Sequence, residues 1–258
     1  MTKRRDFLKT GAAAAGIIVA GRLLKPADAF ARFARFENAD IEALLLQAVD
    51  QLKSGGATFA DARIGRYRRQ NVSTREQQIT GVSDTGSMGL GVRALLNGTW
   101  GFAATRELTP DGVSAAVREA LAIARANRIP GAEPVVLAPG QKHGRVTWKS
   151  AYTTDPWDVP LEEKAALLFK ANAEALKVPT VRFVSSSMSF VKEEKFYANT
   201  DGSIISQTII RSDLPFNATA VAPDNSDSQS RSGPVQPMGR GYEYILAQDI
   251  GTNARLWA

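Results

Sequence analysis

The sequence of 258 residues contains no cysteine and a single histidine, His143. Without cysteine the chain can form no disulfide, no thiolate metal ligand and no thiol nucleophile. One histidine argues against a Ser-His-Asp triad and excludes a zinc site built from several histidines. His143 lies between Lys142 and Gly144 in a polar stretch, where we expect an ordinary exposed residue. Composition therefore removes most catalytic and metal-binding constellations from this chain.

A strong excess of one charge is also missing from most of the sequence. The formal net charge is +6, but residues 1–29 hold six basic and two acidic side chains and so account for +4 of it. Residues 30–258 carry only +2, whereas nucleic-acid-binding domains concentrate positive charge. We therefore expect no nucleic-acid partner.

The first 29 residues have the pattern of an export signal. The basic pair Arg4 and Arg5 precedes the apolar run 11–21, and the small residues Ala27 and Ala29 form an A-x-A site. Such an arrangement describes a cleaved signal peptide, and the apolar run is too short to span a bilayer. The twin arginine resembles the twin-arginine export signal. We predict cleavage after Ala29, a periplasmic location and membrane contact only through the signal; the alternatives are a retained anchor or a basic amphipathic N-terminus.

Apolar periodicity divides the rest of the sequence into two predicted units. Residues 30–130 indicate an α+β unit that begins with a helix over 40–53. Residues 131–150 are rich in proline and glycine and predict a linker. Residues 151–258 predict a second unit, with a helix over 160–177. The expected fold class is α+β, with antiparallel sheets flanked by helices in two consecutive units.

The clearest turn signal is the Asn-Gly pair at 97–98. It separates two runs of strand-forming residues, 90–96 and 99–105, and Asn-Gly favours the positive φ angles of a two-residue hairpin. Trp100 and Phe102 share one face of the returning strand, where we expect them to pack into the core.

Other boundaries follow from caps and from alternation of polar and apolar residues. Thr109 and Pro110 predict a helix start, as N-cap and first-turn proline. The remaining predicted elements are two strands in 61–79 around a turn near Gln70 and Asn71, strands at 181–190, 194–198 and 203–211, a turn at Asp201 and Gly202, a long surface loop at 219–244, and a helix start after it.

Three sequence features that suggest binding or catalysis have structural explanations. Gly86, Gly89 and Gly91 reverse the dinucleotide fingerprint, and a strand rather than a helix follows them, so we predict backbone roles. The serines at 185–187 lack the G-x-S-x-G context of a nucleophile. The basic cluster at 66–69 predicts either a binding patch or a solvated strand face.

The stretch GLGVRALLNGTWGFAAT, residues 89–105, closely resembles the hallmark of the TldD/PmbA family of zinc metallopeptidases. The resemblance extends over most of residues 40–258 and covers the family's N-terminal and central domains. The family's catalytic motif, H-E-x-x-x-H at the start of its C-terminal domain, is absent here, and so is that domain. Zinc belongs to the complete family, and no catalytic or metal-binding residue of the family can be assigned to this chain.

The resemblance also implies partners. The family forms dimers, commonly of a metal-bearing and a metal-free subunit, around a chamber that admits small unfolded peptides. Arg93 and Trp100 lie inside the matched motif and are candidate chamber or interface positions, with core packing the alternative for Trp100. We expect either the N-terminal part of an exported peptidase, truncated and inactive alone, or a non-catalytic peptide-binding or partner subunit of a complete homologue, in a homodimer or a mixed dimer.

Overall fold

The computed structural model describes residues 38–258, so the predicted signal residues Arg4, Arg5, Ala27 and Ala29 lie outside the described part. In chain order the elements are α3 (Asn38–Ser54), β1 (Phe59–Arg75), β2 (Gln78–Leu96), β3 (Thr99–Thr105), α4 (Pro110–Ala126), β4 (Arg145–Lys149), the 3₁₀ helix η1 (Pro156–Asp158), α5 (Leu161–Ala175), β5 (Val181–Asn199), β6 (Ile204–Asp213), β7 (Phe216–Val221), β8 (Ser228–Ser232), α6 (Tyr242–Ala247) and α7 (Ile250–Trp257). None of the described helices is both long and apolar enough to cross a membrane.

All eight strands within residues 38–258 belong to one sheet. Its main path runs β3-β2-β1-β5-β6-β4, and β7 pairs with both β5 and β8. The pairs are antiparallel, except that β4 runs parallel to β6. The predicted α+β class is confirmed. The division into units at 30–130, 131–150 and 151–258 stays a prediction, and the strands of both units join one sheet because β1 pairs with β2 on one side and β5 on the other.

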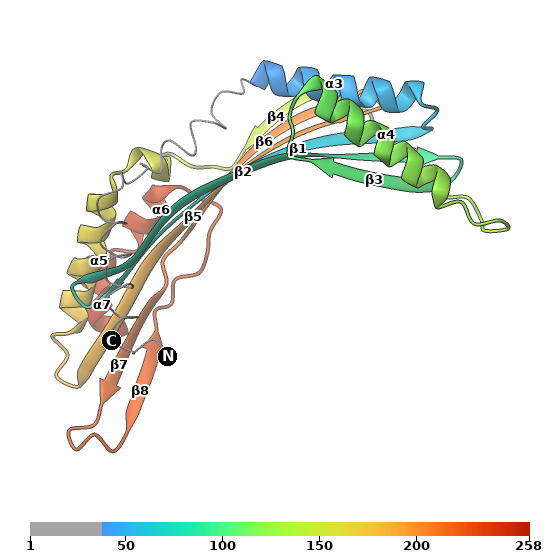
Figure 1. Ribbon diagram of the computed structural model, residues 1–258. Coiled ribbons are helices and arrows are strands. Elements are labelled where there is room, and N and C mark those ends of the chain that lie inside the picture. The colour runs from blue at the N-terminus through green and yellow to red at the C-terminus, as the bar shows by residue number, and fades with distance from the viewer. Residues whose placement is uncertain (1–37) are drawn as a thin grey trace, which may run out of the picture.

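The five described α-helices cover the same face of this sheet. Figure 1 shows the sheet as an arch, with α3 and α4 over one end and α5, α6 and α7 over the other, all on the convex side. Because strand residues alternate between faces, the even-numbered residues of β1 point toward the helices: Ala60 and Ile64 belong to the core under α3 and α4, and Val72 to the core under α5. The odd-numbered residues of β1 line the concave face.

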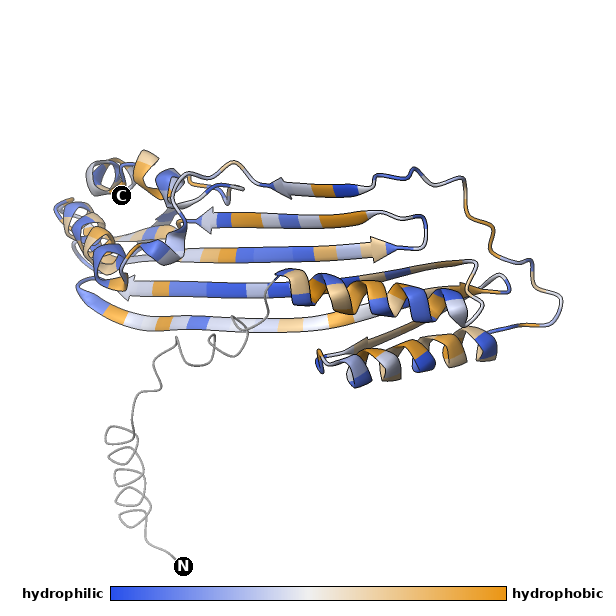
Figure 2. Cartoon of the chain, turned by 90° about the horizontal axis from the view of Figure 1, so that it is seen from above, coloured by the Kyte–Doolittle hydropathy of each residue, from blue (hydrophilic) through white to orange (hydrophobic). Residues whose placement is uncertain are grey.

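Two hydrophobic clusters fill the space between helices and sheet. One lies under α3 and α4, and the other under α5, α6 and α7. Strand β5 contributes to both, through Phe196 to the first and Met188 and Phe190 to the second. The two cores are therefore connected by continuous strands. Figure 2 shows these strands side by side, with apolar and polar segments interspersed along them.

The turn and cap predictions around residues 97–110 are confirmed. Asn97 and Gly98 have φ angles of 51° and 78°, as a primed two-residue hairpin requires. The Thr109 side chain accepts a hydrogen bond from the backbone N–H of Gly112 at 3.1 Å, and Pro110 occupies the first turn of α4.

The predicted turn near Gln70 and Asn71 is wrong, because β1 runs unbroken through both residues. Gln70 is buried and donates to Asp84 at 3.0 Å, while Asn71 donates to the Ser189 hydroxyl at 2.7 Å. Their polar groups are satisfied across the sheet rather than by a turn. The chain turns at Glu76 instead, whose φ is 47°.

The predicted burial of Phe102 is also wrong, and that of Trp100 is only partial. Phe102 is 57% exposed and Trp100 is half-buried, whereas Gly101 and Ala103 face α4. A Cβ on Gly101 would lie 1.9 Å from the carbonyl oxygen of Ala120. The close approach of helix and strand at Gly101 therefore sets which face of β3 is inside.

Two further boundaries differ from the prediction. The strands expected at 181–190 and 194–198 are one strand, β5, and the expected loop at 219–244 contains β8 and the end of β7. In both places hydrogen bonds to neighbouring strands extend regular structure through polar sequence.

A buried lysine fastens α5 to the sheet. Lys164 is 0% exposed, and its ammonium donates to the side-chain oxygen of Gln70 and, at 2.6 Å, to the carbonyl oxygen of Pro156. It also lies 4.9 Å from the Phe190 ring centroid and 6.0 Å from that of Tyr242. Burial lowers the pKa of Lys164 to about 8.

Candidate functional site

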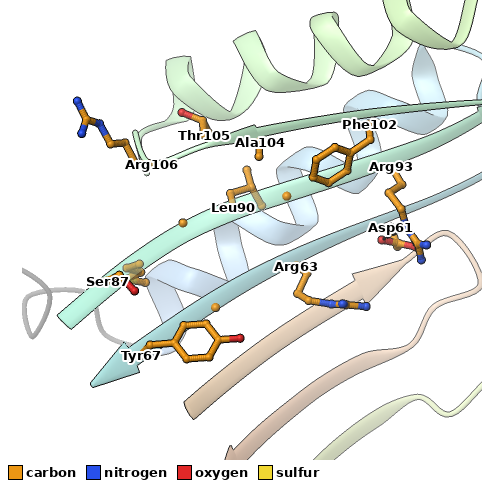
Figure 3. A pocket seen from close by; sticks show the side chains of 14 residues that line it. Asp61, Arg63, Tyr67, Ser87, Leu90, Arg93, Phe102, Ala104, Thr105 and Arg106 are labelled. Carbon is orange, nitrogen blue, oxygen red and sulfur yellow. Dashed lines mark hydrogen bonds and ion pairs between the residues drawn. The ribbon is translucent and has the colours of Figure 1, made fainter. Parts of the chain in front are cut away.

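The concave face of the sheet carries a hollow of about 740 Å³ over β1, β2 and β3. Figure 3 shows Tyr67 and Ser87 at one end of it and Phe102, Arg93 and Asp61 at the other. Most of the side chains come from odd positions of β1 and β2 and even positions of β3, which strand pairing places on one face. The hollow is thus a product of register, on the side opposite the helices.

Small residues form the floor of the hollow. Gly65 lies directly opposite Gly89, and Gly91 lies directly opposite Ala104. These pairs form two adjacent rows across the sheet. Because no side chain larger than a methyl group rises from these four positions, the floor of the hollow lies close to the backbone of the three strands.

Two aromatic rings border this floor. A Cβ on Gly65 would lie 2.9 Å from the ring of Tyr67, and a Cβ on Gly91 would lie 3.2 Å from the ring of Phe102. The glycines therefore let both rings lie low over the sheet. The side chain of Phe102 is exposed and apolar, which suits contact with a ligand better than packing within the described residues.

An ion pair between exposed Arg93 and buried Asp61 lies at the Phe102 end. The guanidinium of Arg93 donates to both carboxylate oxygens of Asp61, with Nε 3.1 Å and 3.0 Å from them, and Asp61 is 2% exposed. Hydrogen bonding to Asp61 raises the pKa of Arg93. The guanidinium also lies 5.4 Å from the centroid of Trp100, which meets Phe59 edge to face at 6.1 Å. The structure thus brings the predicted residues Arg93 and Trp100 into contact, with Arg93 at the hollow.

A second network anchors the other end. The Tyr67 hydroxyl donates to Glu193 at 2.7 Å, Arg211 donates to Glu193 at 2.8 Å, and Lys195 lies 2.9 Å from it. Burial opposes ionisation of Glu193, but these three donors outweigh it and lower its pKa to about 2. The same hydrogen bond to Glu193 raises the pKa of Tyr67. Tyr67 is therefore held in place as a neutral phenol.

The basic cluster at 66–69 is not one patch. Arg66 and Arg68 point to the helix side of the sheet, where they pair with Glu194 at 2.7 Å and Asp84 at 2.8 Å. Arg69 lies on the concave face, with its guanidinium 5.9 Å from the Tyr67 ring centroid. Strand alternation separates the three charges.

The serines at 185–187 form strand surface and a structural network. Ser186 is buried, and its hydroxyl donates to Asn172 at 2.8 Å and lies 2.9 Å from the Thr74 hydroxyl. Asn172 donates in turn to Thr74 at 3.0 Å. This closed set of hydrogen bonds attaches α5 to the sheet.

The described residues do not offer a zinc site. Within 38–258 no group of three or more His, Cys, Asp or Glu side chains is placed to hold a metal ion. His143 is exposed, and its backbone N–H donates to the Ser203 hydroxyl at 3.1 Å. The donor set present here therefore does not fit the zinc that the family resemblance implies.

Two family models match this chain. PmbA/TldA metallopeptidase domain 1 matches residues 60–124, and the PmbA/TldA metallopeptidase central domain matches residues 154–255. The chain belongs to the PmbA/TldD metallopeptidase family. The predicted resemblance is confirmed.

A curated relative of this PmbA/TldD family member is longer than the chain itself. A metalloprotease from Methanothermobacter thermautotrophicus is 30% identical over 196 residues, which are 74% of this chain and 40% of that protein. The chain therefore spans less than half of that curated relative.

Solved structures show the same fold. A Thermotoga maritima protein described as a modulator of a DNA gyrase aligns with a TM-score of 0.65 at 17% identity, over 84% of this chain and 47% of its own. TldE from Thermococcus kodakarensis aligns with a TM-score of 0.61 at 14% identity, over 85% of this chain and 48% of its own.

Sequence reasoning found Arg93 at the hollow but missed Gly65, Arg63 and Tyr67. The signal that could have found them is positional: glycine in the interior of a predicted strand, with Arg and Tyr two residues away on the same face. This signal could not be used, because the sequence does not give the register in which β2 pairs with β1.

Proposed function

We propose that this chain is a non-catalytic part of an exported PmbA/TldD-type peptidase assembly that acts on small unfolded peptides, and that its concave sheet face lines the space where the peptide lies. The observation that carries the proposal is the hollow of about 740 Å³ on the helix-free face of a family member. Its volume lies within the range of about 300–1,000 Å³ for small-molecule sites. The glycine floor of the hollow and the aromatic rings beside it suit a peptide ligand with an extended backbone.

Catalysis in this proposal comes from residues outside 38–258, in a further domain or in another subunit. The absence of a fitting zinc donor set among the described residues supports this assignment. A homologous TldD/PmbA-type subunit or a second copy of this chain is the proposed partner. The described strands β3, β4 and β8 end the sheet and offer edges to a neighbouring chain.

Peptide binding and hydrolysis test the proposal together. The purified full chain is incubated with Zn²⁺ and a fluorogenic decapeptide, alone and with a complete PmbA/TldD homologue. We expect peptide binding without hydrolysis for the chain alone, and cleavage in a co-purifying complex with the homologue. Stoichiometric zinc with hydrolysis by the chain alone would overturn the non-catalytic assignment.

We also propose export through the twin-arginine route, supported by the pattern of Arg4, Arg5, Ala27 and Ala29. Residues 1–29 fused to a folded fluorescent protein should deliver it to the periplasm of a bacterial host. Changing both arginines to lysine should keep the reporter in the cytoplasm. Export that persists in this variant would count against the twin-arginine route.

A further inference from the structure

Two arginines at the hollow have no acidic partner. The side chain of Arg63 on β1 forms no hydrogen bond or ion pair with another described residue, and its guanidinium carbon lies 5.7 Å from the ring centroid of Tyr197. A guanidinium whose N–H groups make no hydrogen bond to the protein keeps them available for a carboxylate. Arg106, just past the end of β3, is exposed and likewise has no hydrogen bond or ion pair within the described part.

Acidic side chains do not neutralise these charges. Asp61 is the single carboxylate among the residues that line the hollow, and Arg93 occupies both of its oxygens. Glu193 lies beyond Tyr67 and is held by Tyr67, Lys195 and Arg211. The residues that line the hollow therefore carry a net charge of +2, from Arg63 and Arg106.

The two arginines lie on either side of β2, in different rows across the sheet. Arg63 lies directly opposite Gly91, and Gly91 lies directly opposite Ala104, two residues before Arg106. Adjacent strands are about 4.8 Å apart, so β1 and β3 are separated by roughly 10 Å. Arg106 is also about 7 Å further along the strand direction, so the two positions are roughly 12 Å apart. Successive side chains of an extended peptide point to opposite faces, so a spacing of four residues, about 13 Å, brings two side chains of one face to this distance.

We propose that the hollow binds an extended peptide segment carrying two carboxylate side chains four residues apart, one paired with Arg63 and the other with Arg106. This inference rests on the proposed function and adds the substrate class. The peptide backbone between the two carboxylates crosses the hollow above Gly89 and Ala104 and contacts the exposed ring of Phe102, which covers Gly91.

Binding and its specificity are measured by fluorescence anisotropy with the full chain. The probe is a fluorescein-labelled hexapeptide of alanine with glutamate at its first and fifth positions, and the matched probe has glutamine at both. We expect the glutamate peptide to bind roughly tenfold more tightly than the glutamine peptide, since two partly exposed ion pairs each contribute up to about 1 kcal/mol. Moving the glutamates to adjacent positions should weaken binding.

Variants locate the contact. The double substitution Arg63→Gln with Arg106→Gln should remove the preference for glutamate, and Arg63→Glu with Arg106→Glu should reverse it in favour of a lysine peptide. The matched control is Arg118→Gln, an exposed arginine of α4 on the helix side of the sheet. Because Arg63 and Arg106 are exposed and outside ion pairs, equal melting temperatures should show that all variants fold.

The outcomes separate the two proposals. Equal binding of both peptides to the unaltered chain, or a glutamate preference that survives in the double variant, would overturn the acidic specificity and leave the peptide-binding proposal standing. Absence of binding by either peptide would overturn both. A preference lost in the double variant and kept in Arg118→Gln would support the assignment.

Discussion

At the residue scale, the fit between β3 and α4 depends on the missing side chain of Gly101. A Cβ there would meet helix backbone atoms, the carbonyl oxygen of Ala120 at 1.9 Å and the amide nitrogen of Ala124 at 2.6 Å. Backbone cannot rotate away as a flexible side chain can. One methyl group at this position must therefore move the helix.

We predict that Gly101→Ala lowers the free energy of unfolding by about 1–3 kcal/mol, the usual cost of overpacking. Gly81→Ala is the matched control, because a Cβ on Gly81 would meet no atom within 4 Å. Gly81→Ala, in β2, should change the free energy of unfolding by less than about 0.5 kcal/mol, or raise that free energy slightly. Urea denaturation measures both, and equal effects of the two substitutions would contradict this account of the interface.

The buried Lys164 gives a second residue-scale prediction. Burial lowers its pKa from 10.5 to about 8, although the neighbouring carboxylates Asp84 and Asp155 favour the charged form. Between pH 8 and 10.5 the unfolded chain therefore binds this proton more readily than the folded chain. Stability should rise with pH in that window, by up to about 3 kcal/mol, and be insensitive to this group below it.

This pH dependence is measured by urea unfolding at several pH values between 7 and 10.5, as the difference between the unaltered chain and Lys164→Met. The difference isolates Lys164 from the other lysines and tyrosines. Lys53→Met, at an exposed position of α3, is the control and should leave the profile unchanged. Parallel profiles for the unaltered chain and Lys164→Met would show that Lys164 keeps an ordinary pKa.

At the element scale, β1 is the strand that joins the two helix groups. Its centre is polar, with Arg68, Arg69, Gln70 and Asn71 in succession, yet it pairs with β2 and β5 on both sides. We predict that the amides of residues 66–72 exchange with solvent as slowly as those of 60–64, by hydrogen exchange mass spectrometry. Fast exchange centred on Gln70 and Asn71 would instead favour the turn that the sequence suggests.

Local signals predicted those elements whose structure is decided locally. The Asn-Gly pair at 97–98 and the Thr109-Pro110 cap act through their own φ angles and hydrogen bonds, and both were predicted correctly. The unbroken course of β1 and β5 could not be predicted, because partners more than a hundred residues away, such as Ser189 for Asn71, satisfy their polar groups.

The same reason limits what could be predicted of the site. Arg93 was identified from a family motif, but the hollow exists because Gly65 and Gly89 meet across two strands. Phe102 was assigned to the core because its side chain is apolar, while the backbone of α4 had already set the inner face of β3 at Gly101. Strand register and the close approach of a helix depend on residues far apart in the sequence. The alternation of polar and apolar residues does not reveal either of them.

At the scale of the whole molecule, the two cores share their strands. Leu45 belongs to the core under α3 and α4, and Leu168 to the core under α5. If one core opened alone, the long strands β1 and β5 would lose packing along half their length while remaining paired in the other half. We therefore expect the described part to unfold in a single transition.

Substituting Leu45→Ala tests this coupling and should cost about 2–5 kcal/mol. Variants that retain either Trp100 or Trp157 as the sole tryptophan report on the two ends separately in urea. Both midpoints should fall together, and Leu256→Ala, at a residue 73% exposed, should move neither. A shift confined to the Trp100 signal would mean that the two ends unfold independently.

The connection between α4 and β4 is the covalent link between the part of the sheet formed by β1, β2 and β3 and the part formed by the later strands. It passes around the end of the sheet (Figure 2), is largely exposed from Arg128 to His143, and is attached at the hairpin by a hydrogen bond of 2.8 Å from the N–H of Val135 to the carbonyl oxygen of Gly98. Strand β1 precedes this connection in the chain and β5 follows it. The two strands are held together by fifteen residue pairs. A single proteolytic cut within the connection should therefore leave two fragments that stay associated, and the same two pieces expressed separately should reassemble into one sheet.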